Sequence, residues 1–201
     1  MLRHSSGMID VYDHVFTSRE IMWMHRYMSH FDGWQLIFDD SEEQSPSTYS
    51  LGRAIDQPNF GPFEEFLIRA INSRIKTIIP DFHRVVYNAF RPGDDPSLHI
   101  DGEYDGSITV MVYPNEEWYP HWGGETVFFR DDECIDSIIP HPGRVVIFPG
   151  NLLHGATAPS KNIKAAARFS VALQFCPGQE DAMEYHAQFQ PVNHRPFPPL
   201  E

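Results

Sequence analysis

Two residues near the middle of the chain, His99 and Asp101, have types and a spacing that suit a metal ion. On a β-strand, residues two positions apart point to the same face, so this imidazole and this carboxylate would lie side by side. They make two thirds of a 2-His-1-carboxylate triad, which binds Fe(II) and leaves coordination positions open for small ligands. A surface loop that happens to carry a histidine and an aspartate is the alternative, because the chain has 11 histidines.

The candidate for the distant third ligand is His154. It follows the apolar run 145–148 and a Pro-Gly-Asn turn, so it would begin a new strand. A histidine beside apolar residues can instead be a hydrogen-bonded core residue. His121 and His141 compete for the role, but both lie in turn-like stretches beside Pro or Trp, where a rigid ligand is less expected.

Arg168 begins an otherwise apolar run that extends to Phe175. Strand alternation places Ser170, Ala172 and Gln174 on the face of Arg168. An arginine that faces the interior needs an anionic partner, because an unpaired buried charge is costly, and its planar fork suits a carboxylate. The pattern therefore predicts an anchor for a carboxylate, which Ser170 can share; a structural Arg–Asp pair is the alternative.

The elements that must position these residues lie mostly after Pro80. Short runs of β-forming residues alternate there with turns rich in Gly, Pro, Asn and Asp, which is typical of a sandwich or jelly roll. The expected strands are 83–90, 108–113, 125–129, 144–148 and 168–175, with shorter runs at 99–101 and 152–154.

Two helices are expected before these strands. The capping box Thr17–Glu20 begins a helix that extends to about Phe31. Pro62 begins a second helix, whose apolar residues keep the three-four spacing until Pro80. A short strand is expected over 35–38, followed by a polar loop over 39–47. The fold class is therefore α+β but mainly β, with the helices packed on the outer face of one sheet.

The composition fits a single domain over residues 1–201, with a helical preface and lid elements in 1–80, a β core in 81–178 and a tail in 179–201. A net charge of −13 disfavours nucleic acid and anionic membranes as partners. No run approaches the roughly 20 apolar residues of a transmembrane helix. The two cysteines lack metal-type spacing, and no signal peptide is apparent, so a reducing, cytoplasmic location is expected.

Taken together, these residues resemble the motif of the Fe(II)/2-oxoglutarate-dependent oxygenase superfamily, in particular its prolyl 4-hydroxylase-like branch. The resemblance covers Val85 to Phe175. The motif is His-x-Asp, a long gap, His and Arg-x-Ser, here His99, Asp101, His154, Arg168 and Ser170. The segments 112–118 and 122–128 also look like that branch, in which a Tyr-Leu-Asn segment precedes Gly-Gly-x-Thr-x-Phe.

The resemblance implies a double-stranded β-helix, a jelly-roll or cupin-like fold, with the metal near one open end. Fe(II) would be held by the two histidines and the aspartate, 2-oxoglutarate would take two further positions, and O2 the last. Tyr113 would hydrogen-bond the distal carboxylate of 2-oxoglutarate beside Arg168. A tyrosine that often precedes the His-x-Asp turn is replaced here by Phe90-Arg91, so Arg91 is free to face co-substrate or substrate, and Tyr87 is a further candidate.

The implied activity is a dioxygenase that hydroxylates an unactivated C–H bond and releases succinate and CO2. Asp101 favours hydroxylation, because related halogenases replace this carboxylate with a small residue. The substrate would be a small molecule (an amino acid or natural-product intermediate) or a prolyl or other peptidyl residue. The protein would be a monomer or homodimer, and residues 39–58 would help to build a lid over the site. The alternative is a non-redox, cupin-like metal- or sugar-binding module, which does not require a carboxylate anchor such as Arg168.

Overall fold

The computed structural model describes residues 2–5, 7–38, 49–75, 82–94 and 96–177. The expected loop over 39–47, the tail over 179–201 and the end of the second expected helix lie outside these described residues. The division of the chain into 1–80, 81–178 and 179–201 stays a prediction.

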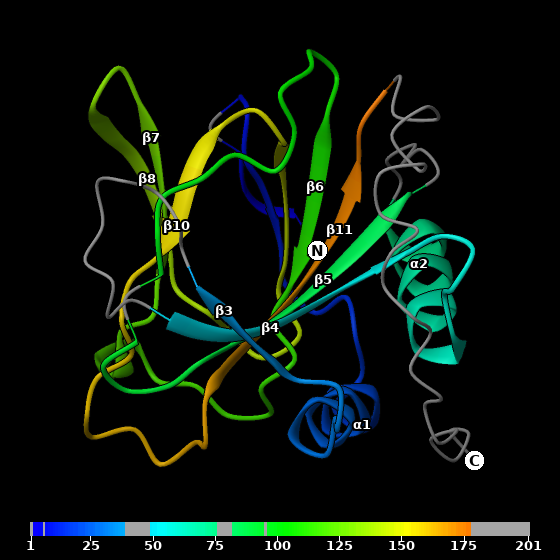
Figure 1. The fold of residues 1–201 in the computed structure, drawn as a ribbon, viewed down its shortest axis with the longest axis vertical. Coiled ribbons are helices and arrows are strands. Elements are labelled where there is room, and N and C mark those ends of the chain that lie inside the picture. The colour runs from blue at the N-terminus through cyan, green and yellow to red at the C-terminus, as the bar shows by residue number, and fades with distance from the viewer. Residues whose placement is uncertain (1, 6, 39–48, 76–81, 95, 178–201) are drawn as a thin grey trace.

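Two antiparallel sheets face each other, as the expectation of a jelly roll required (Figure 1). The large sheet has the order β1-β2-β9-β6-β11-β5-β4-β3, and the small sheet has the order β10-β7-β8. The strands of the large sheet are β1 (Leu2–Ser5), β2 (Asp10–Tyr12), β3 (Gln35–Phe38), β4 (Tyr49–Asp56), β5 (Arg84–Phe90), β6 (Ile108–Val112), β9 (Val145–Pro149) and β11 (Arg168–Phe175). The strands of the small sheet are β7 (Thr126–Arg130), β8 (Glu133–Ile138) and β10 (Leu153–Ala156).

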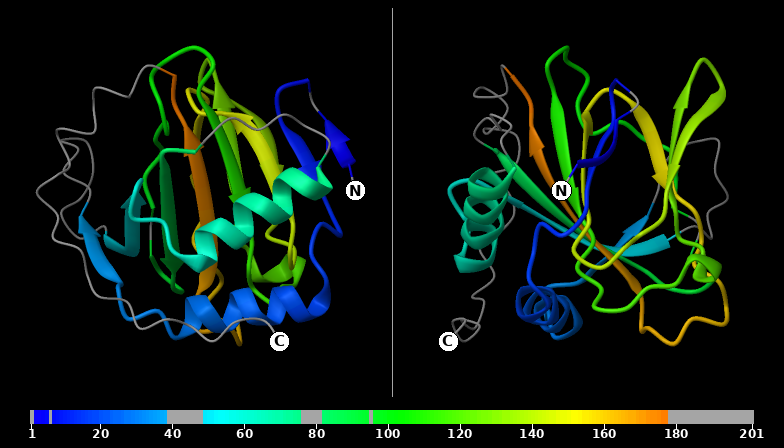
Figure 2. Two further views of the ribbon diagram at one scale, coloured as in Figure 1. Left: turned by 90° about the vertical axis from the view of Figure 1, so that its right-hand side faces the viewer. Right: turned by 180° about the vertical axis from the view of Figure 1, so that it is seen from behind.

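Helices α1 (Ser18–Ser29) and α2 (Pro62–Arg74) both cover the outer face of the large sheet, which confirms the expected packing (Figure 2). The predicted capping box begins α1, because the Thr17 hydroxyl accepts from the Glu20 amide and the Glu20 carboxylate accepts from the Thr17 amide. Pro62 begins α2, as expected, since its missing N–H is not needed in a first helical turn. Neither helix, in the part of the chain that the structure describes, is long and apolar enough to cross a membrane.

The large sheet separates two apolar layers. Alternate residues of β11, namely Phe169, Val171 and Leu173, join the core between the sheet and the helices. A smaller core, which includes Phe128 and Phe148, lies between the two sheets. Because strand side chains alternate, the other face of β11 is directed between the sheets, where the candidate site lies.

Several strands were not expected from the sequence. β8 has mostly exposed side chains, so it lacks the apolar alternation that marks a strand, and its pairing with β7 defines it. β4 lies inside the stretch 39–58, which was expected to be a loop that forms a lid. Residues 49–56 are instead a strand that pairs with both β3 and β5. The expected strand at 99–101 is reduced to a single bridge between His99 and His154.

Candidate metal and co-substrate site

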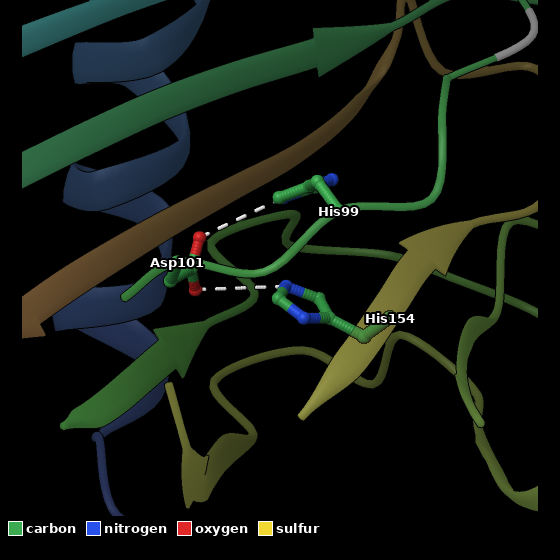
Figure 3. Close-up of side chains that lie close together, drawn as sticks. All are labelled: His99, Asp101 and His154. Carbon is green, nitrogen blue, oxygen red and sulfur yellow. Dashed lines mark ion pairs between the residues drawn. The ribbon is translucent and has the colours of Figure 1, made fainter. Parts of the chain in front are cut away.

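Three ligand-type side chains converge between the sheets: His99, Asp101 and His154 each offer a ligand atom, and these atoms lie within 4.8 Å of one another. His99 Nε2 is 3.6 Å from Asp101 Oδ1, and His154 Nε2 is 3.5 Å from Asp101 Oδ2. Figure 3 shows both imidazoles turned toward the carboxylate, with His154 projecting from β10. The structure thus brings together the three residues that the sequence proposed as ligands.

The backbone holds these three residues in register. The amide of His99 donates to the carbonyl of His154 over 2.8 Å, and the amide of His154 donates back over 2.9 Å. The amide of Asp101 donates to the carbonyl of Gly150, also over 2.8 Å. The segment that carries His-x-Asp is therefore bound to β10 and to the turn before it, although it is not a regular strand.

Hydrogen bonds determine which nitrogen of each imidazole is available. His99 Nδ1 lies 3.1 Å from the carbonyl oxygen of Ser97, and His154 Nδ1 lies 2.9 Å from that of Leu152. A carbonyl oxygen only accepts, so each Nδ1 carries the proton and each Nε2 presents its lone pair to the cluster. Burial also lowers the pKa of His154, which is 2% exposed, and so favours the neutral ring that a metal needs.

Two further side chains orient the carboxylate. Thr109 Oγ1 donates to Asp101 Oδ2 over 2.6 Å, and Gln174 Nε2 donates to Asp101 Oδ1 over 2.7 Å. Sequence reasoning missed both as partners of Asp101. Only one signal pointed to either of them, namely the alternation that placed Gln174 on the same face as Arg168.

The guanidinium of Arg168 is deeply buried, with 1% of the residue exposed. Its Nε donates to the carbonyl of Gly124 over 3.1 Å, Nη1 donates to Ser170 Oγ over 2.9 Å and Nη2 donates to Thr126 Oγ1 over 2.7 Å. Burial lowers the pKa of Arg168. No carboxylate among the described residues lies within salt-bridge distance of the Arg168 guanidinium. The alternative of a structural Arg–Asp ion pair is therefore not observed among these residues.

Gly124 permits this arrangement through its backbone conformation. Its φ is +77°, a backbone conformation that residues other than glycine rarely adopt. A Cβ at this position would lie 3.2 Å from Trp118 Cζ2 and 3.3 Å from Arg168 Cγ. The Gly-Gly turn noted in the sequence therefore brings the carbonyl of Gly124 to Arg168 just before β7 begins.

The triad and Arg168 open onto the same pocket, whose walls come from both sheets. Ser170 and Gln174 line it from β11, and Thr126 lines it from β7. The donor set of two imidazoles and one carboxylate, all reached from the pocket, fits Fe(II) with open coordination positions. On β11, Gln174 lies beside the triad and Arg168 carries the guanidinium. This strand therefore connects the metal-ligand end of the pocket with the guanidinium end.

Other residues proposed for the co-substrate are placed differently. Tyr113 is fully buried beside Arg168, and its hydroxyl lies 2.7 Å from Thr126 Oγ1, but Tyr113 is not among the residues that line the pocket. Tyr87 faces the opposite side of β5, where its hydroxyl donates to the buried carboxylate of Glu64. Strand alternation explains this placement, since Val86 and Asn88, the neighbours of Tyr87 on either side, are the ones that line the pocket.

Arg91 and the two competing histidines also lie away from the cluster. Arg91 follows β5 and pairs with Asp94, and it is not among the residues that line the pocket. His121 lies in the short 3-10 helix η1 (Pro120–Trp122) and stacks on Tyr119. The described part of the chain thus assembles one cluster of metal-ligand type, and His121 and His141 do not belong to it.

Comparison with known proteins agrees with this geometry. Residues 82–175 match the family model described as the 2OG-Fe(II) oxygenase superfamily. No curated protein matches the chain. Among solved structures, a Pseudomonas putida prolyl-4-hydroxylase is similar, with 18% identity, coverage of 85% of this chain and 93% of that chain, and a TM-score of 0.59.

Two further solved structures share the fold. A prolyl hydroxylase from Trichoplax adhaerens, in complex with a hypoxia inducible factor oxygen degradation domain peptide fragment, has 15% identity and a TM-score of 0.65, with coverage of 89% of this chain and 87% of that chain. A non-heme alpha-ketoglutarate-dependent carbocyclase from nogalamycin biosynthesis has 12% identity and a TM-score of 0.62, with coverage of 93% and 90%. At these identities the likeness is one of fold.

Proposed function

We propose, from the premise that this chain belongs to the 2OG-Fe(II) oxygenase superfamily, that it hydroxylates an unactivated C–H bond of an organic substrate. The reaction joins one oxygen atom of O2 to the substrate carbon and the other to succinate, while 2-oxoglutarate loses CO2. Fe(II), 2-oxoglutarate and O2 are the cofactor and co-substrates of this family. When bound, the iron supplies the activation of O2 and the oxidising power, and the protein supplies binding and orientation.

In this proposal, His99, Asp101 and His154 hold the iron. The Nδ1 hydrogen bonds of the two histidines keep both Nε2 lone pairs directed at the same point. Thr109 and Gln174 hold the carboxylate of Asp101 from its two oxygens, which limits its rotation. Such supporting bonds raise metal affinity because the ligands do not have to be ordered when the ion binds.

The observation that carries the proposal is the buried guanidinium of Arg168, which lines the same pocket as the triad without a carboxylate partner among the described residues. An unpaired buried charge is costly, so this site favours an anionic ligand. Ser170 Oγ accepts from Arg168, which leaves the hydroxyl proton of Ser170 free to donate to the same anion. The distal carboxylate of 2-oxoglutarate meets both needs, and its keto acid end would then face the metal.

Tyr113 has an indirect role in this proposal. Its hydroxyl lies beside Thr126 Oγ1, which accepts from Arg168 Nη2. The Tyr113 ring also lies 5.1 Å from the Arg168 guanidinium carbon, a distance typical of a cation–π contact. Tyr113 therefore supports the position of Arg168, and a cupin-like binding module would have no need of this arrangement.

The substrate is proposed as either a small molecule, such as an amino acid or natural-product intermediate, or a prolyl or other peptidyl residue. The peptide in the Trichoplax adhaerens complex supports the second option. A net charge of −13 supports the absence of nucleic-acid and anionic-membrane partners. Cys134 and Cys176 are both free, which supports a cytoplasmic location. The protein is proposed to be a monomer or homodimer.

The test begins with metal-free protein under anaerobic conditions. Addition of Fe(II) and then 2-oxoglutarate should produce a weak visible charge-transfer band, because the keto acid binds the iron directly. O2 is then admitted in the presence of a library of metabolites and short peptides, and succinate is measured. If neither the band nor substrate-stimulated succinate appears, the protein is not a 2-oxoglutarate-dependent oxygenase.

A further inference from the structure

Most polar side chains that line the pocket already have a partner or a task. The triad offers ligand atoms, Gln174 bonds Asp101, and Arg168 bonds Ser170 and Thr126. One polar side chain of the lining is left over, that of Asn88. Within the described part of the chain, its carboxamide makes no hydrogen bond.

Asn88 lies in the middle of β5, on the face that is directed between the sheets. Its neighbours on that face, Val86 and Phe90, also line the pocket, whereas the residues between them are in the helix-side core. Ser170 is opposite it in β11 and Gly52 is opposite it in β4. Since glycine has no side chain, nothing on β4 competes with a ligand for the amide at that level.

Asn88 lies on a different strand from the groups that serve the co-substrate, although one of them, Ser170, is its register partner. Arg168, Ser170 and Gln174 all lie on β11, so a diacid that joins Arg168 to the metal would follow that strand. Asn88 lies one strand away, on the side of β4, where a second ligand can approach the same metal. This arrangement favours a contact with the primary substrate.

The walls near Asn88 offer no other charge for a substrate. Asn88, Thr126, Ser170 and Gln174 are the uncharged polar residues of the lining. Apart from these, the triad and Arg168, the lining is apolar and includes Val86, Phe90, Met111 and Ala172. On the same face of β4 and β5, Asp56 and Arg84 satisfy each other through a 2.7 Å ion pair. An ammonium or a second carboxylate would therefore be desolvated here without a partner among the described residues, at a high cost in free energy.

We infer that Asn88 is a specificity-determining residue that hydrogen-bonds an uncharged amide, carbonyl or hydroxyl group of the primary substrate beside the carbon that reacts. A carboxamide both donates and accepts, so it suits such a group, and it carries no charge with which to bind an ion. A free amino acid is disfavoured, because neither of its charged groups has a counterpart near Asn88. This inference rests on the proposed function.

The experiment compares matched probes on the anaerobic protein loaded with Fe(II) and 2-oxoglutarate. Amino acids blocked as N-acetyl, N-methylamide derivatives are the neutral probes, and the same free amino acids are the charged ones. Binding is measured as a change in the charge-transfer band, and turnover as succinate released after O2 is admitted. We expect the neutral probes to change the band and to raise succinate, and the free amino acids to do neither at the same concentration.

Variants then test Asn88 itself. Asn88→Leu should require about tenfold more neutral probe for the same change in the band, which is the usual effect of losing one hydrogen bond. Asn88→Ser, which keeps a donor and an acceptor, should recover part of the response. Asn72→Leu, at an exposed position of α2, should behave as the unmodified protein. The 2-oxoglutarate affinity of all three variants should stay within about twofold of that of the unmodified protein. This measurement also reports whether each variant folds.

Three results would overturn the inference while leaving the proposed function intact. The first is a normal 2-oxoglutarate band with no response to any neutral probe. The second is an equal response to the free amino acids. The third is an Asn88→Leu variant that loses 2-oxoglutarate affinity as much as probe affinity, because Asn88 would then serve the co-substrate. Absence of the band in the unmodified protein would instead remove the proposed function.

Discussion

His99 and His154 exchange both backbone hydrogen bonds, although one follows an irregular turn and the other lies on β10. This single bridge brings their rings to a centroid separation of 4.6 Å. The two histidines of the candidate metal site are therefore placed by the backbone itself. Their side chains do not depend on a long strand around His99, which the structure does not contain.

Replacement of either histidine should remove the metal while the fold survives. We expect His99→Ala and His154→Ala each to lose bound iron and succinate formation, since two ligands do not complete the triad. His99 has a side chain that is 51% exposed, so its loss should change the melting temperature little. His154 packs on Phe148, so its loss should cost more stability.

The measurements for these two variants are metal content after desalting and a thermal melt by circular dichroism. His121→Ala is the matched control, because His121 lies outside the cluster. Iron content equal to that of the unmodified protein in either variant would show that the ion binds elsewhere.

Replacement of Arg168 should act on the co-substrate. Arg168→Ala should raise the 2-oxoglutarate concentration for half-saturation by about a hundredfold, the upper range for losing hydrogen bonds to a charged group. The titration of the charge-transfer band measures this directly. Arg91→Ala should leave the titration unchanged, because Arg91 pairs with Asp94 outside the pocket. An unaltered requirement in Arg168→Ala means that the anchor is misassigned.

Loss of the side chains that support Asp101 should weaken metal binding without removing any ligand. Gln174→Leu and Thr109→Val each delete one hydrogen bond to the carboxylate. We expect about a tenfold to hundredfold loss of Fe(II) affinity in each, as measured for such supporting bonds elsewhere. Competition with a chelator of known affinity gives the value, and a result within twofold of the unmodified protein would contradict the assignment.

The Glu20–Arg74 ion pair should make the fold sensitive to acid. The hydrogen bonds from Arg74 lower the pKa of Glu20 from 4.5 to about 2. Because the unfolded chain then binds the proton more readily, the stabilisation is complete above about pH 5 and is lost as the pH falls toward 2. We expect the free energy of unfolding to fall by about 1 kcal/mol over this range, since the pair is partly screened by solvent. Glu20→Gln should remove this fall.

Thermal unfolding of the two proteins at a series of pH values between 7 and 3 checks this prediction. Glu65→Gln, at an exposed position of α2, is the control. If the curves of the unmodified protein and Glu20→Gln run parallel over the acid range, the pair does not contribute in this way.

The sequence by itself determined the local geometry of the candidate site residues, because strand and helix periodicity fix which side chains share a face. The spacing of His99 and Asp101, the alternation that begins at Arg168 and the capping box at Thr17 are all local patterns, and local patterns reflect strand and helix geometry directly. The structure brings His99, Asp101, His154 and Arg168 to one pocket. The variants above test the roles proposed for these four residues.

Only the tertiary structure decided which distant side chains touch. Thr109 and Gln174 reach Asp101 because β6 and β11 are neighbours, and no local pattern encodes that pairing. Tyr87 is excluded from the pocket because the register of β5 turns it toward α2, although its type suited the role. β4 and β8 form for the same reason, since weakly patterned segments become strands when a partner strand satisfies their backbone hydrogen bonds.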